Sequence, residues 1–320
     1  MSELRERLVG IYHFLGDMVP DNLPVVEPRL RTNNPWTRDG KVLLSRIKVS
    51  QSVKSSIIEC LTLLGGVEKS IKTGMRVFVK PNFNSADPPP ATTALDFLQA
   101  VLEILKETGA NPIVGDCAGG IWRPTRNVFA KLGLYEFASK MGVKLVALED
   151  DPHNWVKVRI SANFFHTVAM PRVAYEADRI VYLPCLKTHN LAIYSGALKL
   201  AVGFVHPGNR RTLHAGNLQS KIAEINLCWQ PDLVIMDARK AFVTGGPAQG
   251  TVVEPCYIMA SGDPFAIDAE GIKILKGYPA KNRLPANPWQ LPQIVYAEKL
   301  GLGVKKDSIL IVEDNTKILD

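Results

Sequence analysis

The sequence predicts an α/β protein in which a mostly parallel β-sheet carries helices on both faces, with Rossmann-like layering. Short apolar runs of strand length alternate with segments whose apolar residues recur at helical spacing. The strand-like runs are apolar throughout, as expected of strands that are buried on both faces. With 320 residues, 46% of them hydrophobic and 22% charged, the chain is long enough and apolar enough to build such a core.

The predicted elements follow one another from residue 41 onward. Strands are expected over residues 42–49, 75–79, 112–115, 144–147, 180–183, 233–236 and 257–260. Helices are expected over residues 52–64, 94–108, 126–141 with a break at Gly133, 215–228 and 264–275. Residues 153–175 resemble β-hairpins and predict a small antiparallel excursion from the sheet.

Residues 1–40 differ from the rest of the chain and are predicted to form an N-terminal extension. It begins with an amphipathic pattern, and prolines after Asp17 prevent a long helix there. Residues 41–320 are expected to form one α/β domain, with two lobes divided near residue 178 as the alternative. The apolar positions of the amphipathic start are Leu4, Leu8, Ile11 and Leu15, and the prolines are Pro20, Pro24, Pro28 and Pro35.

Several classes of protein are excluded by what the sequence lacks. No apolar run approaches the roughly 18 residues of a membrane span, and the first ten residues do not resemble a signal peptide. The five cysteines occur singly, without a CxxC pair, so we expect reduced thiols, a cytoplasmic location and no iron–sulfur cluster. Neither GxGxxG nor GxxxxGK[ST] occurs, which excludes the common dinucleotide and P-loop motifs.

Polar residues follow several of the predicted strands. Ligands of such sheets bind beyond the carboxyl ends of the strands. Lys80 and Asn82 follow strand 75–79 and are candidates for binding a carboxylate or phosphate. Asp116 follows strand 112–115 among small residues, as a base, a metal ligand or a helix cap. Asp237 follows strand 233–236 and is a candidate ligand or base.

The segment from Arg179 to Ala223 contains no Asp or Glu, yet it holds six lysines and arginines and three histidines. Without the six basic residues of this segment, the formal net charge of the chain would be +1 instead of +7. A cationic cluster without acids is stabilised when an anion completes it, so we expect an anion pocket here. A crowded lysine also loses its proton more easily, as a general base or a Schiff-base nucleophile requires.

These motifs together resemble the DUF362 family, a domain of unknown function, over about residues 75–275. Many relatives add a ferredoxin-like cysteine motif that this chain lacks. The motifs are Lys80-Pro81-Asn82, Gly115-Asp116, Pro184-x-x-Lys187-Thr188-His189, Lys199 with Gly203, Arg210 to His214, Gly246-Pro247, Asp263-Pro264 and Asp268.

A weaker resemblance is to the nickel-pincer lactate racemase family. His189, Lys199 and His214 occur in the order of a histidine, the cofactor-bearing lysine and a second histidine of that family. Where that family has a further catalytic histidine, this chain has Gly115-Asp116-Cys117. The likeness therefore implies a shared architecture more than a shared reaction.

The favoured hypothesis is an enzyme that binds a small anionic metabolite and carries out isomerase or lyase chemistry, with a divalent metal as one option. The alternatives are a redox or cofactor-handling protein, and a nucleic-acid-binding protein, which the sparse aromatic residues of the basic segment disfavour. We expect no membrane partner and leave a homo-oligomer open. The candidate residues are Lys199, His189 and Asp116 for catalysis, Lys80, Asn82, Lys187, Arg210 and Arg211 for the substrate, and His189, His214 and Asp237 for a metal.

Overall fold

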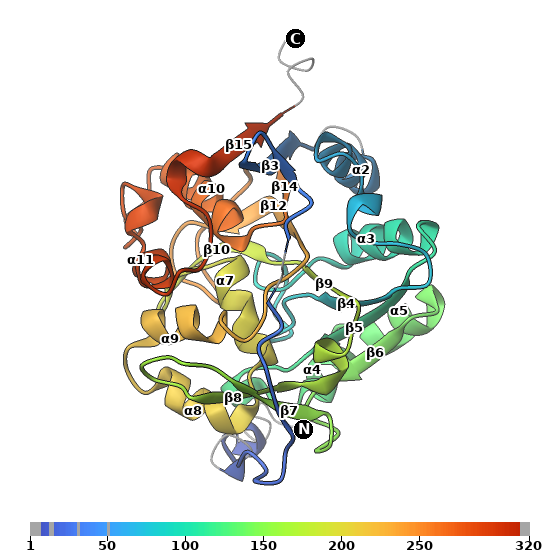
Figure 1. Ribbon diagram of the computed structural model, residues 1–320, viewed down its shortest axis with the longest axis vertical. Coiled ribbons are helices and arrows are strands. Elements are labelled where there is room, and N and C mark those ends of the chain that lie inside the picture. Colours follow the sequence, from blue (N-terminus) through green and yellow to red (C-terminus); the bar gives the residue numbers. More distant parts are fainter. Residues whose placement is uncertain (1–7, 13–15, 31–32, 50–51, 314–320) are drawn as a thin grey trace.

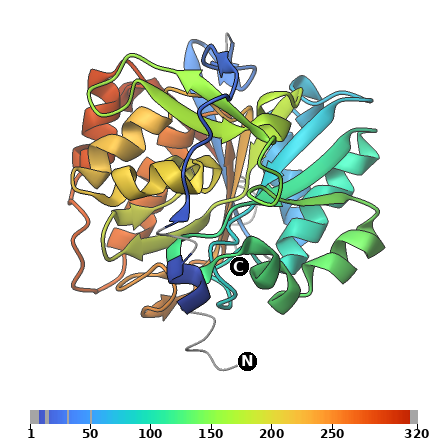
Figure 2. The ribbon, with the colours of Figure 1, turned by 90° about the horizontal axis from the view of Figure 1, so that it is seen from below.

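The computed structural model describes residues 8–12, 16–30, 33–49 and 52–313, and in it a central β-sheet lies between two layers of helices (Figure 1). Figure 2 shows the sheet nearly edge-on, with the early helices on one side and the late helices on the other. The first layer holds α2 (Val53–Leu63), α3 (Leu95–Glu107), α4 (Thr125–Lys131) and α5 (Leu134–Met141). The second holds α7 (Ala197–Leu200), α8 (Pro207–His214), α9 (Leu218–Ile225), α10 (Pro264–Lys276) and α11 (Pro292–Lys299).

The central strands follow a spatial order that differs from their order in the chain. It is β15 (Ile309–Val312), β3 (Lys41–Lys48), β14 (Tyr257–Ser261), β12 (Leu233–Phe242), β9 (Arg179–Tyr182), β4 (Arg76–Lys80), β5 (Asn111–Asp116) and β6 (Lys144–Ala147). From β12 to β6 the neighbours are parallel. These strands place Lys80 and Asp116 at the same edge of the sheet, where β4 and β5 end.

The rest of the sheet corrects the prediction that it is mostly parallel. β14 runs antiparallel to both β12 and β3, so the sheet is mixed. The chain passes from β12 to β14 without a crossover helix and therefore returns antiparallel. Four short strands extend the sheet: β2 (Thr37–Arg38), β10 (Cys185–His189), β11 (Ile193–Ser195) and β13 (Val252–Val253). β2, β11 and β13 pair antiparallel with β3, β10 and β12, respectively. β10, which the sequence did not predict, pairs in parallel with β12.

Alternate residues of the strands pack into two separate hydrophobic cores. On β4, Phe78 belongs to one core, whereas Val77 and Val79 belong to the other. The same alternation occurs on β12, where Met236 and Ile235 face opposite helix layers. Successive side chains of a strand point to opposite faces, so a strand that is apolar throughout is buried on both sides. This arrangement confirms the prediction of helices on both faces.

The predicted helices are present, and one of them is shorter than expected. The break at Gly133 is present, where a positive φ of 68° separates α4 from α5. The helix expected over residues 215–228 is α9, which begins at Leu218 and ends at Ile225. The preceding α8 was not predicted, and Gly216 and Asn217, which both have positive φ, separate the two helices. Glycine and asparagine tolerate this left-handed conformation, which ends an α-helix. The consequence is that His214 ends α8 rather than preceding a longer helix.

The N-terminal extension packs against the rest of the protein. Its β1 (Val25–Val26) joins β7 (Trp155–Arg159) and β8 (Thr167–Pro171), which are antiparallel to each other and confirm the excursion predicted near residues 153–175. The short helix α6 (Arg172–Tyr175) follows β8. Leu4 and Leu15 lie outside the described residues. No helix in the described part of the chain has the length and apolar character needed to cross a membrane.

Candidate functional site

A pocket of about 500 Å³ lies beyond the carboxyl ends of β4 and β5, between β10, α7 and α8. It gathers eight of the ten residues that the sequence singled out. Four of its charged side chains are cationic and one is a carboxylate. The eight residues are Lys80, Asn82, Asp116, Lys187, His189, Lys199, Arg210 and His214.

The single carboxylate of the pocket is part of a buried ion pair. Lys80 Nζ lies 2.7 Å from Asp116 Oδ1, and the two side chains are 1% and 3% exposed. The backbone N–H groups of Phe83 and Cys117 also donate to Asp116, each at 2.7 Å. Burial lowers the pKa of Lys80, and Asp116 opposes this shift. With its carboxylate fully engaged, Asp116 fixes Lys80 in place and is a poor candidate for a free base.

Two further cations of the pocket make their contacts to backbone carbonyls. Lys187 Nζ donates to Ala91 O at 2.5 Å, and burial is the main cause of the lowered pKa of this lysine. Arg210 donates to the carbonyls of Cys117, Ala118, Gly203 and Val205 at 2.7–3.0 Å. Arg210 therefore holds the loops around the pocket in place and adds positive potential. The ammonium group of Lys187 donates one hydrogen bond to Ala91 O, and its other N–H groups can donate to a ligand.

Lys199 is the unpaired cation of the site. It lies on α7, it lines the pocket, and its amine has neither a hydrogen bond nor an ion pair with the described residues. Burial, followed by the charges of Lys187, Arg210 and Lys80, lowers its pKa from 10.5 to about 7. A large part of Lys199 is consequently a neutral amine at neutral pH, which can accept a proton or attack a carbonyl carbon.

The two histidines of the pocket are held as opposite tautomers. His189 Nδ1 accepts hydrogen bonds from the N–H groups of Leu191 and Ala192, both at 3.1 Å, so a neutral ring carries its proton on Nε2. Burial is the main cause of the lowered pKa of His189, with Lys199 and Lys187 adding to it. His214 Nδ1 lies 2.8 Å from Arg210 O and must donate to it, leaving the Nε2 lone pair available. His189 thus offers a donor and His214 an acceptor.

These contacts do not suit the metal set that the sequence suggested. A metal bound at His189 Nε2 would need the proton on Nδ1, which already faces two N–H donors. Among the described residues, no group of three or more His, Cys, Asp or Glu side chains is arranged to hold a metal ion.

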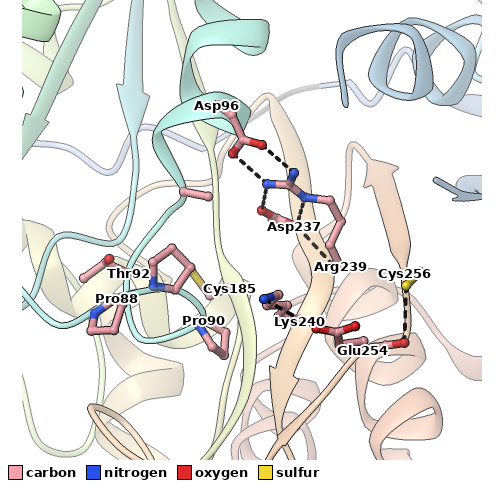
Figure 3. A pocket seen from close by; sticks show the side chains of 12 residues that line it. Pro88, Pro90, Thr92, Asp96, Cys185, Asp237, Arg239, Lys240, Glu254 and Cys256 are labelled. Atoms are coloured by element: carbon pink, nitrogen blue, oxygen red, sulfur yellow. Dashed lines mark hydrogen bonds and ion pairs between the residues drawn. The ribbon is translucent and has the colours of Figure 1, made fainter. Parts of the chain in front are cut away.

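Asp237 and Arg211 are not among the residues that line this pocket. Asp237 lines a second cavity, shown in Figure 3, where it binds Arg239, which also forms a two-bond ion pair with Asp96. It lies in the middle of β12 because that strand extends six residues beyond the predicted Met236. Arg211 donates from Nη2 to Asp17 O of the N-terminal extension at 3.0 Å.

A buried carboxylate from another element supports the turn that carries Lys199. Asp268 of α10 is fully buried and accepts hydrogen bonds from the N–H groups of Ala197 at 2.6 Å and Leu198 at 3.0 Å. Burial raises its pKa to about 7. Gly196 is required for this approach, because a Cβ there would lie 2.2 Å from Asp268 Oδ1. Asp268 is a positioning residue for Lys199.

The remaining wall of the pocket is apolar and comes from Trp122, Leu191, Leu200, Val202 and Pro247. Of these residues, only Pro247 was singled out from the sequence, as part of the Gly246-Pro247 motif. Trp122 ends the 3-10 helix η2 (Gly120–Trp122), and Val202 lies on η3 (Ala201–Phe204). Leucine and valine beside a basic segment resemble ordinary core residues, so the sequence carried no signal for them. Asn84 and Ser195 also line the pocket.

The fold and site define an α/β protein with a pocket at the ends of its parallel strands, which combines basic side chains with a mostly apolar surface. Residues 77–273 match the model of the family described as "Domain of unknown function (DUF362)", and the chain belongs to this family. It is also similar to the thylakoid-associated protein sll1697 of Synechocystis sp., with 26% identity over 271 residues, which cover 82% of this chain and 79% of the relative. The family match runs from β4 to α10 and spans most of the pocket.

Proposed function

We propose that this protein is an enzyme that binds a small organic anion, a carboxylate or a phosphate, and moves a proton at the carbon next to it, as an isomerase or lyase does. One observation carries the proposal: four cations line the pocket against a single carboxylate, and that carboxylate is occupied by Lys80. Among the described residues Lys187 and Lys199 form no ion pair, so Lys187 and the protonated fraction of Lys199 are available to a bound anion. A pocket of about 500 Å³ is of the size that holds small ligands.

The remaining groups suit proton transfer beside a carboxylate. A proton on that carbon becomes acidic only when the negative charge that develops on the ligand is stabilised, and Lys187 and the Nε2–H of His189 can do so. The neutral amine of Lys199 and the free Nε2 of His214 are the groups able to accept the proton. Asn82 also lines the pocket, two residues after the end of β4, and can orient the ligand through its side-chain amide.

The inward position of the charges disfavours the alternative functions. Lys80 and Lys187 line the pocket and are each 1% exposed, so they cannot reach the backbone of a nucleic acid on the surface. Of the five cysteines, four are buried and come from separate segments of the chain, which does not favour a redox centre.

Titration calorimetry with inorganic phosphate and with benzoate tests the proposal. Wild-type protein should bind at least one of these anions. Lys199→Met and Lys187→Met should each weaken binding about tenfold, which corresponds to about 1.4 kcal/mol. Lys240→Met is the matched control, because Lys240 is an exposed lysine that pairs with Glu254 in the other cavity. Equal affinities in Lys240→Met and both pocket variants, or no binding to wild type, would reject the anion site.

A further inference from the structure

Three lysines line the pocket, and only one of them has an amine without a polar partner among the described residues. Lys80 Nζ donates to Asp116 and to Pro81 O, and Lys187 Nζ donates to Ala91 O. Lys199, in contrast, makes no such contact in the part of the chain that the structure describes. Its helix is held from behind by Asp268, so the amine is aimed by a rigid support rather than by a partner of its own. An unpaired amine on a fixed turn is the arrangement that nucleophilic attack needs.

The surroundings of this amine favour its neutral, nucleophilic form. Burial and the neighbouring cations Lys187, Arg210 and Lys80 all act against protonation of Lys199. Lysines that form imines with carbonyl compounds are commonly activated in this way, by desolvation or by a second cation. A solvated surface lysine such as Lys240 has no comparable environment.

We propose that Lys199 forms an imine with the carbonyl carbon of a small oxo acid, whose carboxylate binds at Lys187. The inference rests on the proposed function, because it adds a covalent step and a substrate class to the same anion pocket. An oxo acid fits both halves of the site, because its carboxylate meets the ammonium group of Lys187 and its carbonyl meets the neutral amine of Lys199.

The chemistry needs no oxidant or reductant, and its only further reactant is one proton from solvent. The Lys199 nitrogen attacks the carbonyl carbon, a C–N bond forms, and the C–O π bond opens to an alkoxide. The nitrogen loses one proton to His214 Nε2, which passes it to the alkoxide oxygen and gives a carbinolamine. A solvent proton, delivered through the same His214 Nε2, then lets the hydroxyl group leave as water, and the nitrogen keeps its second proton as an iminium. The Nε2–H of His189 donates to the oxygen while negative charge develops on it. The resulting iminium withdraws electrons from the neighbouring C–H bond, which is the acidification that an isomerase or lyase requires.

Borohydride trapping tests this directly. The full-length protein is incubated separately with pyruvate, acetoacetate and glyoxylate, reduced with sodium borohydride and digested, and the modified lysines are identified by mass spectrometry. With at least one probe, Lys199 should carry at least tenfold more reduced adduct than Lys240. Excess inorganic phosphate, which competes for the pocket, should lower the Lys199 adduct and leave the Lys240 adduct unchanged.

Two variants separate the imine from the anion site. Lys199→Arg keeps the positive charge and should abolish the adduct, with its fold checked by circular dichroism. Lys240→Arg should trap as much oxo acid at Lys199 as wild type does. If no probe labels Lys199 above Lys240 while phosphate or benzoate still binds, the imine is rejected and the proposed function stands. If neither anion binds and no adduct forms, both proposals are rejected.

Discussion

Lys80 and Asp116 form a buried ion pair at the floor of the pocket, with 2.7 Å between Nζ and Oδ1 and almost no exposure of either side chain. The two residues come from adjacent parallel strands and are the last residues of β4 and β5. The carboxylate of Asp116 fixes the position of Lys80 and balances its charge. The other cations of the pocket therefore have no carboxylate of the pocket to pair with and can bind a ligand. It also makes the pocket sensitive to any change in either partner.

Removal of the carboxylate should destabilise the whole protein. Asp116→Asn leaves the Lys80 ammonium buried without a counter-charge, and the loss of one member of such a pair costs about 3–5 kcal/mol. Urea unfolding at pH 7 measures the change. Glu176→Gln is the control, since it breaks the exposed Arg172–Glu176 pair at 3.8 Å and should cost less than about 0.5 kcal/mol. A similar cost for both variants would contradict the importance of the buried pair.

Gly203 should tolerate no side chain. A Cβ at this position would lie 2.5 Å from Lys80 Nζ and 2.8 Å from Asp116 Oδ1, so Gly203→Ala must push the pair apart. We expect a loss of about 1–3 kcal/mol in the free energy of unfolding, as for other overpacked sites, together with weaker anion binding. Gly16→Ala is the control, because no described residue lies within 4 Å of a Cβ at that position. Unchanged stability and affinity in Gly203→Ala would show that the pair can move freely.

Asp268→Ala should disturb Lys199 without touching the pocket. The N–H groups of Ala197 and Leu198 lose their acceptor, and loss of a capping side chain costs about 0.5–2 kcal/mol. We also expect slower labelling of Lys199 by an amine reagent such as trinitrobenzenesulfonate. Asp263→Ala removes a cap of the same kind from α10, where it accepts from Phe265 and Ala266, and should leave the labelling rate unchanged. Equal labelling rates in both variants would reject the positioning role.

The stability of the protein should depend on pH through Lys199. The folded protein releases the Lys199 proton near pH 7, whereas the unfolded chain holds it until about pH 10.5. Between these values the unfolded state binds more protons, so the contribution of this group to the free energy of unfolding rises with pH. The lowered pKa values of Lys80 and Lys187 act with the same sign. Lys199→Met removes only the contribution of Lys199 to this pH dependence of the free energy of unfolding.

Urea unfolding of wild type and Lys199→Met at pH 6.5, 8 and 9.5 measures this contribution. The advantage of wild type over the variant should grow, or its disadvantage shrink, as the pH rises. A difference that stays constant or moves in the opposite direction would mean that Lys199 keeps an ordinary pKa in the folded protein.

The apolar wall should make the pocket prefer anions with an apolar body. Benzoate should bind more tightly than acetate, because its ring can pack against Trp122. Trp122→Ala should remove most of this difference while leaving the affinity for acetate within about twofold, and titration calorimetry measures both. A benzoate preference that survives in Trp122→Ala would place the ring elsewhere.

The sequence alone determined the strands that build the floor of the pocket and the segment that carries its charge. Apolar runs buried on both faces leave a clear pattern, and so does a stretch of 45 residues without an acid. Lys80, Asp116, Lys187, Lys199 and the two histidines could be named because they follow such strands or lie in that segment.

Only the tertiary structure decided which side chains are free. It showed that Asp116 and Arg210 are fully engaged, that Lys199 is not, and that Asp237 faces another cavity. It also showed that β14 runs against its neighbours and that Trp122 and Val202 complete the pocket. A side chain's partners come from distant segments, as with Asp268 and Ala197, and local sequence patterns carry no record of such contacts.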